Sequence, residues 1–329
     1  MKLASIERIK EVTKHPNADL LDIVAVLNYK AIVKKDSYKV NDLIVFIQPD
    51  TVLPDKEWAQ FYKAKSSRVK AIKLRNVWSF GIVESLFNVG FNGDFSNKEG
   101  EDISDLLGIT KYEPPVPQDL QAKGSLPFDI PKTDEERYQN LLAIPYNEIV
   151  DVTLKVDGSS FSVYCKKLPD ESWSTGITGR TLELKTDCEN KYTIIAKKYD
   201  LLDKFEKYCR TYNVSLVLRG EMYGNGIQNF KTNPHATKPL GIAFFSVYNI
   251  DNRLYEGTES PHYYENVCSR LGLETVPMLE KGVVLTPELI KKYDEDLETI
   301  AGTMFEGVVI KLRNGESFKV INKHYDAKK

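Results

Sequence analysis

Residues 88–132 form a stretch rich in glycine and proline that divides the chain into two parts. These residues are Gly90, Gly93, Gly100, Gly108, Pro114, Pro115, Pro117, Pro127 and Pro131. Proline fixes φ and lacks a backbone N–H, so this density disfavours the interior of helices and sheets. A chain of 329 residues is long enough for about two domains. We therefore expect an N-terminal domain over residues 1–110, a linker over 111–132 and a second domain over 133–329.

Short runs rich in β-branched residues alternate with polar, turn-prone segments in the N-terminal part. The runs cover residues 21–27, 31–33, 43–47, 69–74 and 81–83. Segments of this length and composition predict β-strands. About five short strands within roughly 100 residues favour a small barrel such as an OB-fold.

Basic residues crowd one stretch of the same part. They are Lys63, Lys65, Arg68, Lys70, Lys73 and Arg75. One interpretation is a solvated face. The other is a face that contacts RNA or phosphate, with Trp78 and Phe80 as stacking groups.

The second part mixes helical and strand patterns. Apolar residues over 191–212 have amphipathic helix spacing. Capping signals predict helix starts at residues 133–136, 260–261 and 286–287. Apolar runs predict strands at residues 214–218, 244–250, 305–311 and 317–321. This pattern is typical of an α+β domain.

Composition argues against several classes of protein. The net charge is −2, so contact with nucleic acid requires a local basic groove rather than a global positive field. The four cysteines are widely spaced and the four histidines are scattered, which predicts reduced thiols and no zinc site. No signal peptide is visible, and no apolar run approaches the roughly 18 residues that span a bilayer. We expect a cytoplasmic protein that does not contact membranes.

Residues 152–160 read Val-Thr-Leu-Lys-Val-Asp-Gly-Ser-Ser and carry the most chemistry. Side chains alternate faces in an extended segment, so Lys155 and Asp157 are expected to point the same way. Gly158 lets the backbone turn or approach a ligand closely. This geometry suits a lysine nucleophile beside a carboxylate that holds a metal. From these residues alone, an exposed Lys-Asp pair at a strand end is the alternative.

Polar residues at the ends of later strands extend this string into an ordered series. The series resembles the motifs of the covalent nucleotidyltransferase superfamily, which comprises ATP-dependent RNA and DNA ligases and mRNA capping enzymes. Any one of these strings is common, whereas six in order on predicted strands argue against chance. Motifs I, Ia, III, IIIa, IV and V correspond to residues 154–158, 179–180, 218–224, 244–250, 306–311 and 318–320.

The N-terminal half narrows the resemblance. It is similar to the OB domain and lead-in of the Deinococcus- and Naegleria-type RNA ligases at residues 15–19, 42–46, 49–54, 72–75 and 131–137. The resemblance covers nearly the whole chain. It implies an N-terminal OB-fold β-barrel followed by an α+β nucleotidyltransferase domain, ATP-grasp-like, with antiparallel sheets.

The resemblance implies an ATP-dependent RNA ligase that works through lysyl-AMP and RNA-adenylate intermediates. Lys155 would attack the α-phosphorus of ATP as a neutral amine, although a free lysine has a pKa of about 10.4. Burial, a cation such as Lys319 or a bound metal would each lower that pKa. Asp157 and Glu306 would hold Mg²⁺ or Mn²⁺, directly or through water. The implied catalytic residues are Lys155, Glu306 and Lys319.

Phosphate contacts are implied for the basic residues of the later motifs. Arg180 would act by a forked hydrogen-bonding group, and Lys319 and Lys311 as point charges. Many relatives carry a second lysine two positions after the first in motif V, but this chain has Ile321 there. Lys311 or Lys323 could substitute for it.

The remaining ATP contacts follow from the other motifs. Glu221 would accept a hydrogen bond from a ribose hydroxyl, and either Phe245 or Tyr248 would stack on adenine. Ser160 is either a group near the adenylated 5′-phosphate or a plain strand-end hydroxyl. The motif I residues expected around the nucleotide are Leu154, Lys155, Val156 and Gly158.

Two other kinds of protein remain as alternatives. DNA ligases and capping enzymes usually place an OB domain after motif V, whereas only ten residues follow Lys319, so we expect no such domain here. A noncatalytic OB-type RNA-binding protein needs no lysine nucleophile, and the intact motif series argues against it. We expect a monomer that acts on RNA with 5′-phosphate and 3′-OH ends, in nicked or duplex form.

Overall fold

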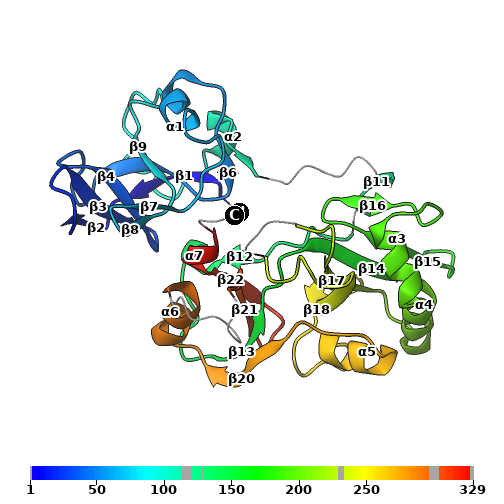
Figure 1. Cartoon of the computed structure of the whole chain (residues 1–329). Coiled ribbons are helices and arrows are strands. Elements are labelled where there is room, and N and C mark those ends of the chain that lie inside the picture. The colour runs from blue at the N-terminus through cyan, green and yellow to red at the C-terminus, as the bar shows by residue number, and fades with distance from the viewer. Residues whose placement is uncertain (1, 113–120, 128, 229–232, 296–303, 327–329) are drawn as a thin grey trace. The chain divides into compact units, whose positions relative to one another are not determined.

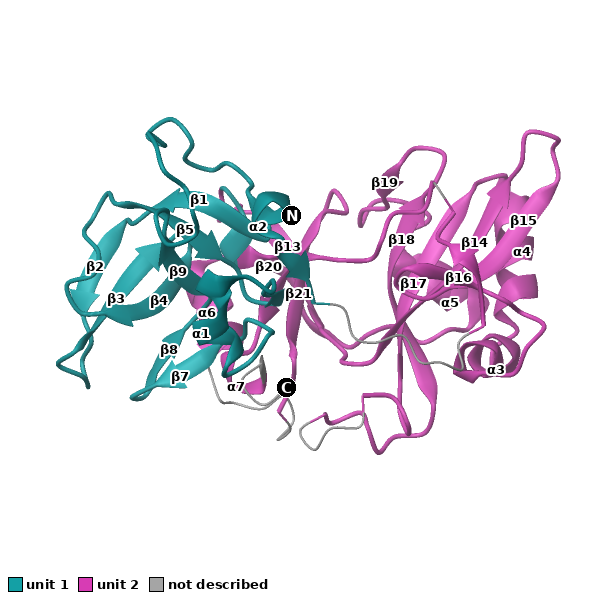
Figure 2. Cartoon of the chain, turned by 90° about the horizontal axis from the view of Figure 1, so that it is seen from above, with its two compact units in different colours: residues 1–115, 139–142, 326–328 teal, residues 116–138, 143–325, 329 magenta. Residues whose placement is uncertain are grey.

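The structure is a computed structural model that describes residues 2–112, 121–127, 129–228, 233–295 and 304–326 (Figure 1). The chain divides into two compact units (Figure 2). Unit 1 contains residues 1–115, 139–142 and 326–328, and unit 2 contains residues 116–138, 143–325 and 329.

Unit 1 is built from short antiparallel strands in the sheet orders β1-β5-β9, β2-β3-β4, β7-β8 and β10-β6. Alternating burial along β3 buries Asp22, Val24 and Val26, the two valines in the apolar core, and leaves the side chains between them half-buried. The strands are β1 (Ala4–Arg8), β2 (Glu11–Lys14), β3 (Leu21–Val26), β4 (Tyr29–Lys34), β5 (Leu43–Ile47), β6 (Thr51–Val52), β7 (Ile72–Leu74), β8 (Val77–Ser79), β9 (Ile82–Ser85) and β10 (Thr110–Lys111). The helices are η1 (Glu57–Ala59), α1 (Gln60–Lys63) and α2 (Ser104–Leu107).

Unit 2 contains two sheets. The seven-stranded sheet has the order β11-β16-β15-β14-β17-β18-β19, and the five-stranded sheet has the order β12-β22-β21-β13-β20. The pair β12–β22 is parallel, and the other pairs that join these strands are antiparallel. The strands are β11 (Ala122–Ser125), β12 (Glu136–Arg137), β13 (Ile149–Leu154), β14 (Ser159–Lys167), β15 (Trp173–Thr178), β16 (Leu182–Leu184), β17 (Leu216–Tyr223), β18 (Gly241–Asn249), β19 (Leu254–Tyr255), β20 (Met278–Val284), β21 (Gly307–Leu312) and β22 (Ser317–Ile321).

Helices cover the seven-stranded sheet and share its largest apolar core (Figure 1). Phe205 of one helix and Val267 of another are buried there with strand residues such as Phe161 and Leu218. The helices of unit 2 are η2 (Tyr138–Asn140), whose last residues belong to unit 1, α3 (Lys191–Lys198), α4 (Leu201–Tyr212), α5 (Tyr264–Leu271), α6 (Pro287–Glu295) and α7 (Lys323–Asp326). No helix among the described residues is long and apolar enough to cross a membrane.

Several expected elements differ from the structure. The helix predicted to start at residues 133–136 is wrong, because residues 136–137 form β12 and pair with β22. The helix predicted over 191–212 is two helices, since Asp200 between them has a φ of 53°. The start predicted at Ser260 is displaced to Tyr264, whereas the start at Pro287 is confirmed.

The glycine- and proline-rich stretch at residues 88–132 also contains regular elements. Helix α2 and strand β10 lie in its first half, and β11 pairs with β16 in its second half. Of its prolines, Pro114, Pro115 and Pro117 lie outside the described residues.

Candidate active site

The segment Lys155–Gly158 crosses from one sheet of unit 2 to the other. It leaves β13 of the five-stranded sheet and enters β14 of the seven-stranded sheet. The Lys155 N–H donates to the Gly307 carbonyl at 2.9 Å. A Cβ on Gly158 would lie 2.2 Å from the Met222 carbonyl oxygen, so only glycine lets the crossing chain lie this close to β17. The crossing brings Lys155 to the motif III and motif IV strands.

Carboxylates surround the Lys155 ammonium. Its Nζ donates to Glu306 Oε2 at 2.8 Å, and the two side chains are 23% and 10% exposed. Burial lowers the pKa of Lys155, but the negative charges of Glu306, Glu221 and Asp157 outweigh burial and raise it above its ordinary value. The protein's own charges therefore keep Lys155 protonated, which is opposite to the depression expected from sequence.

Glu221 lies on β17, where its Cα pairs with Ser160 of β14. Burial raises the pKa of Glu221 to about 8; Lys155 opposes this rise, and Glu306 and Asp157 add to it. A pKa near 8 leaves Glu221 largely protonated at neutral pH, so the negative charge beside Lys155 rests on Glu306 and Asp157. This negative charge suits a ligand that brings positive charge.

Asp157 is 4% exposed and is held by two contacts. Its Oδ2 accepts from the Tyr325 hydroxyl of α7 at 2.7 Å, and its main-chain oxygen accepts from Asn233 Nδ2 at 3.2 Å. Tyr325 was missed by the sequence reasoning, because nothing in its local pattern links it to motif I. These contacts fix the carboxylate beside the nucleophile.

The expected metal ligands, Asp157 and Glu306, supply two carboxylates for a hard divalent cation. Within the described ranges, no group of three or more His, Cys, Asp or Glu side chains lies close enough to hold a metal ion. Asp157 and Glu306 supply carboxylate oxygens, the donors that Mg²⁺ and Mn²⁺ prefer, and carry the negative charge beside Lys155. Mg²⁺ usually keeps several waters and binds through one or two carboxylates plus phosphates, so this donor set suffices.

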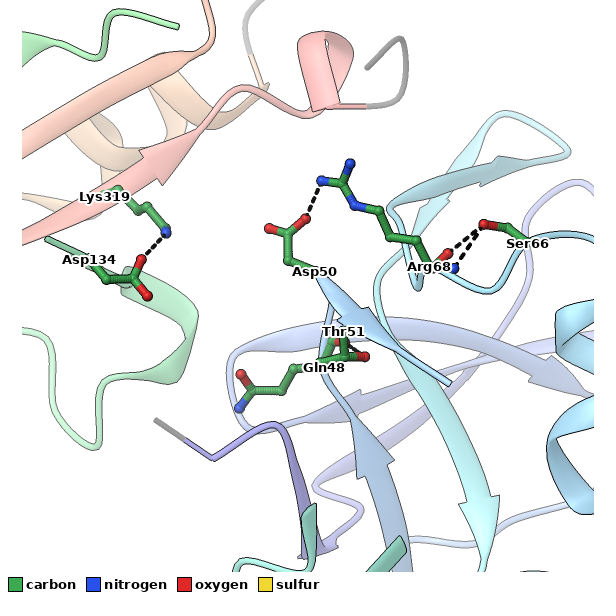
Figure 3. Close-up of polar contacts among 7 residues, drawn as sticks. All are labelled: Gln48, Asp50, Thr51, Ser66, Arg68, Asp134 and Lys319. Carbon is green, nitrogen blue, oxygen red and sulfur yellow. Dashed lines mark hydrogen bonds and ion pairs between the residues drawn. The ribbon is translucent and has the colours of Figure 1, made fainter. Parts of the chain in front are cut away.

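Two cations from different elements converge on Asp134. Arg180 of the β15–β16 turn has its NH2 3.4 Å from Asp134 Oδ2. Lys319 of β22 has its Nζ 3.4 Å from Asp134 Oδ1 (Figure 3). The structure therefore brings two of the predicted phosphate-binding residues, Arg180 and Lys319, to one carboxylate. Asp134 was not predicted in this role, because its sequence pattern indicated a helix cap.

The two aromatic candidates for adenine stacking lie in different clusters. Phe245 packs against a buried cluster that contains Val156, and Leu154 packs against the same cluster; Leu154 and Val156 flank Lys155 in sequence. Tyr248 is buried with Val217, and the Arg219 guanidinium lies 5.8 Å from its ring centroid. The structure thus brings Phe245, and not Tyr248, to the motif I strand.

Lys311 and Lys323, the substitutes considered for a second motif V lysine, both have other partners. Lys311 is 6% exposed and donates to the Phe245 carbonyl at 2.6 Å. Lys323 contacts Asp294 and Glu295, each at 2.9 Å. Ser160 Oγ is buried and has no hydrogen-bond partner within the described part of the chain. It remains a candidate for contact with a phosphate.

The basic stretch of unit 1 is partly neutralised. Arg68 NH2 lies 2.6 Å from Asp50 Oδ1 (Figure 3), and Lys63 Nζ lies 3.0 Å from Asp55. Phe80 is 6% exposed and packs in the core, so it is not a stacking group. Trp78 is half-buried, with Lys73 Nζ 5.7 Å from its ring centroid.

Comparison with known proteins adds an independent observation. The RNA ligase family model matches residues 148–323, and a model of an OB-fold domain matches residues 3–86. A search of curated proteins by sequence gives no match. The matches confirm the expected N-terminal OB-fold and the α+β ligase domain.

Solved structures of Naegleria gruberi RNA ligase are similar over essentially the whole chain. A mutant of that ligase with ATP and Mn has a TM-score of 0.83 and 26% identity, covering 99% of this chain and 98% of that one. A mutant with AMP and Mn has a TM-score of 0.84 and 27% identity, covering 100% and 99%. The same ligase with pyrophosphate has a TM-score of 0.80 and 28% identity, covering 99% and 98%.

Proposed function

This chain belongs to the RNA ligase family, and we propose that it seals RNA 3′-OH and 5′-phosphate ends through lysyl-AMP and RNA-adenylate intermediates. The observation that carries the proposal is the position of Lys155, whose Nζ is held 2.8 Å from Glu306 among Glu221 and Asp157. The related Naegleria structures with ATP and Mn, AMP and Mn, and pyrophosphate support ATP and a divalent metal as cofactors.

The first step forms a bond from Lys155 Nζ to the α-phosphorus of ATP and breaks the bond to pyrophosphate. Nζ must first lose its proton, which Glu306, Glu221 and Asp157 oppose by raising its pKa. Asp157 and Glu306 would hold Mg²⁺ or Mn²⁺, which supplies positive charge beside these carboxylates and at the phosphate oxygens when bound. Glu306 also orients the amine through its 2.8 Å contact.

Other residues of the site hold the nucleotide. When ATP binds, Arg180 and Lys319 leave Asp134 and bind the phosphate oxygens, because the triphosphate carries more negative charge than a single carboxylate. Glu221 accepts a hydrogen bond from a ribose hydroxyl, and Phe245 stacks on adenine. The close approach of Gly158 to β17 and the 2.9 Å bond from the Lys155 N–H to the Gly307 carbonyl hold the backbone on which Lys155 is carried.

The second and third steps use the same site. A 5′-phosphate oxygen of RNA attacks the lysyl-AMP phosphorus, the N–P bond breaks, and Lys155 recovers its proton. The RNA 3′-oxygen then attacks the 5′-phosphorus, the phosphodiester forms, and AMP leaves. We propose that the Ser160 hydroxyl, which has no hydrogen-bond partner among the described residues, donates to the 5′-phosphate during these steps. We propose nicked or duplex RNA as the substrate and a monomer as the active species.

A gel assay with labelled ATP tests the first step. We expect covalent label on the wild-type protein with Mg²⁺ or Mn²⁺ and none on Lys155→Ala. Label from GTP alone would indicate a capping enzyme, and no label from either nucleotide would indicate a noncatalytic RNA-binding protein. Sedimentation of the active fraction tests the monomer.

A joining assay tests the later steps. Nicked, tailed and single-stranded RNAs carrying 3′-OH and 5′-phosphate ends are incubated with ATP and metal, beside a nicked DNA of the same sequence. We expect sealing of the nicked RNA. Failure to join any of the RNAs, or sealing confined to the DNA, would overturn the proposed substrate.

A further inference from the structure

Strand β18 contains a β-bulge at Phe245. Arg219 of β17 pairs with Ser246 of β18, but the next residue, Gly220, pairs with Phe244. Phe245 is therefore the extra residue on β18. A bulge takes the extra residue out of the ladder and re-aims its side chain, and bulges are frequent next to active sites.

Gly220 makes room for this bulge from the opposite strand. A Cβ at this position would lie 2.9 Å from Phe244 Cδ1 and 2.9 Å from the Ala243 carbonyl oxygen. Phe244 also pairs outside the ladder, since its N–H donates to Glu274 and its carbonyl accepts from Val276, both at 2.9 Å. The bulge is therefore built into both strands.

The Phe245 carbonyl is bonded by a buried ammonium instead of a strand neighbour. Lys311 Nζ donates to it at 2.6 Å and lies 5.8 Å from the Phe245 ring centroid and 5.0 Å from the Tyr264 ring centroid. Lys311 is 6% exposed. Burying an ammonium costs free energy unless hydrogen bonds compensate, and the bond to the Phe245 carbonyl supplies such compensation.

The charge of Lys311 survives its burial at neutral pH. Burial lowers the pKa of Lys311 to about 8, and the carboxylates of Glu135, Asp151 and Glu265 oppose this decrease. A protonated Lys311 donates a charge-assisted hydrogen bond, which is stronger than a neutral one.

We propose that Lys311 is a positioning residue that fixes the β18 bulge and sets the Phe245 ring in place for the nucleotide base. It acts through the Phe245 carbonyl and makes no contact with phosphate. Phe245 packs against the buried cluster that contains Val156, and Leu154 packs against the same cluster, so a change in the bulge is expected to move Phe245 relative to Lys155. This inference rests on the proposed function for the identity of the ligand.

Binding experiments separate base from phosphate. In a Lys155→Met background, which cannot form lysyl-AMP, ATP and inorganic tripolyphosphate are titrated calorimetrically with Mg²⁺. We expect Lys311→Met to weaken ATP binding about tenfold, the size of one lost charge-assisted hydrogen bond, and to leave tripolyphosphate binding unchanged. Lys311→Arg keeps a donor and is expected to recover part of the loss. Equal weakening of ATP and tripolyphosphate would overturn the proposal in favour of a phosphate contact.

The matched control is Lys198→Met. Lys198 also donates from Nζ to a main-chain carbonyl, that of Leu240 just before β18, at 3.0 Å, but it is exposed and outside the bulge. We expect this variant to bind ATP as the parent does. A similar loss in both lysine variants would show a general effect on β18 and refute the assignment.

A double-mutant cycle tests the route through Phe245. If Lys311 acts through the ring, Lys311→Met should add little to the loss caused by Phe245→Ala. Full additivity of the two losses would refute the route.

Amide hydrogen exchange makes the test independent of the proposed function. We expect faster exchange at residues 244–246 in Lys311→Met and no change there in Lys198→Met. Unchanged exchange in Lys311→Met refutes the inference even if the protein forms lysyl-AMP. Faster exchange in a protein that binds no ATP supports the bulge contact and refutes the proposed function instead.

Discussion

Replacing Asp134 by asparagine tests whether this carboxylate competes with phosphate. Asp134 lies 3.4 Å from both Arg180 and Lys319, and the three side chains are 24%, 32% and 13% exposed. Partly exposed ion pairs of this kind contribute about 0.2–1 kcal/mol each. If ATP must displace both pairs, their removal improves ATP affinity by about 0.4–2 kcal/mol, or roughly two- to thirtyfold. We therefore expect Asp134→Asn to bind ATP more tightly than the parent.

The assay is calorimetric titration of ATP with Mg²⁺ in the Lys155→Met background, at low and high salt. Asp129→Asn is the matched control, because Asp129 pairs with Lys166 at 2.8 Å with 28% and 24% exposure in the same unit. The gain should shrink at high salt, since salt screens partly exposed charges. Weaker ATP binding in Asp134→Asn, or an equal gain in Asp129→Asn, would refute competition and indicate that Asp134 is a structural anchor.

Three further predictions follow from the site. The pKa of Glu221 is raised from 4.5 to about 8, so its protonation stabilises the fold below pH 4.5 and this contribution is lost as pH rises through about 8. The melting temperature of Glu221→Gln, relative to that of the wild type, should therefore increase between pH 5 and pH 9. A difference in melting temperature that stays constant with pH would contradict the raised pKa. A Cβ in Gly158→Ala meets the Met222 carbonyl at 2.2 Å, so we expect a loss of about 1–3 kcal/mol in the free energy of unfolding, measured by denaturant titration, and little lysyl-AMP; wild-type stability would show that the crossing relaxes. Tyr325→Phe removes the 2.7 Å bond to Asp157, and we expect a higher metal concentration for half-maximal lysyl-AMP formation, whereas an unchanged metal titration would place Asp157 outside the metal site.

Local sequence patterns predicted those strands and helix starts that are determined by residues close together in the sequence. The strands predicted at residues 43–47 and 317–321 have the same bounds as β5 and β22. The predicted helix-capping residue Thr286 accepts a hydrogen bond from the Leu289 N–H at 3.2 Å. Lys155, Glu306 and Glu221 were selected as site residues through the resemblance to the motif series, and the structure brings Glu306 and Glu221 close enough to act on the charge of Lys155.

Long-range contacts explain the errors. Thr133 resembles a helix cap, but its hydroxyl accepts from Arg219, and the following residues pair with β22. A residue 86 positions away in sequence thus takes the group that the local pattern assigned to a cap. The sequence left both Phe245 and Tyr248 open as the stacking residue for the same reason. The one-residue shift at the bulge involves Gly220 and Lys311, which lie on other strands.

The charge of Lys155 shows how far the sequence can define a mechanism. The motif series correctly placed Glu306, Glu221 and Asp157 as neighbours, yet their combined effect on the pKa follows only from geometry. The cation expected to offset them, Lys319, lies 3.4 Å from Asp134, so part of its charge is already balanced. The chain by itself therefore stabilises the protonated amine. In the mechanism that we propose, the neutral amine would require positive charge brought to Glu306 and Asp157 together with the nucleotide. Proton loss coupled to nucleotide binding in this way would keep Lys155 unreactive toward other electrophiles until ATP binds.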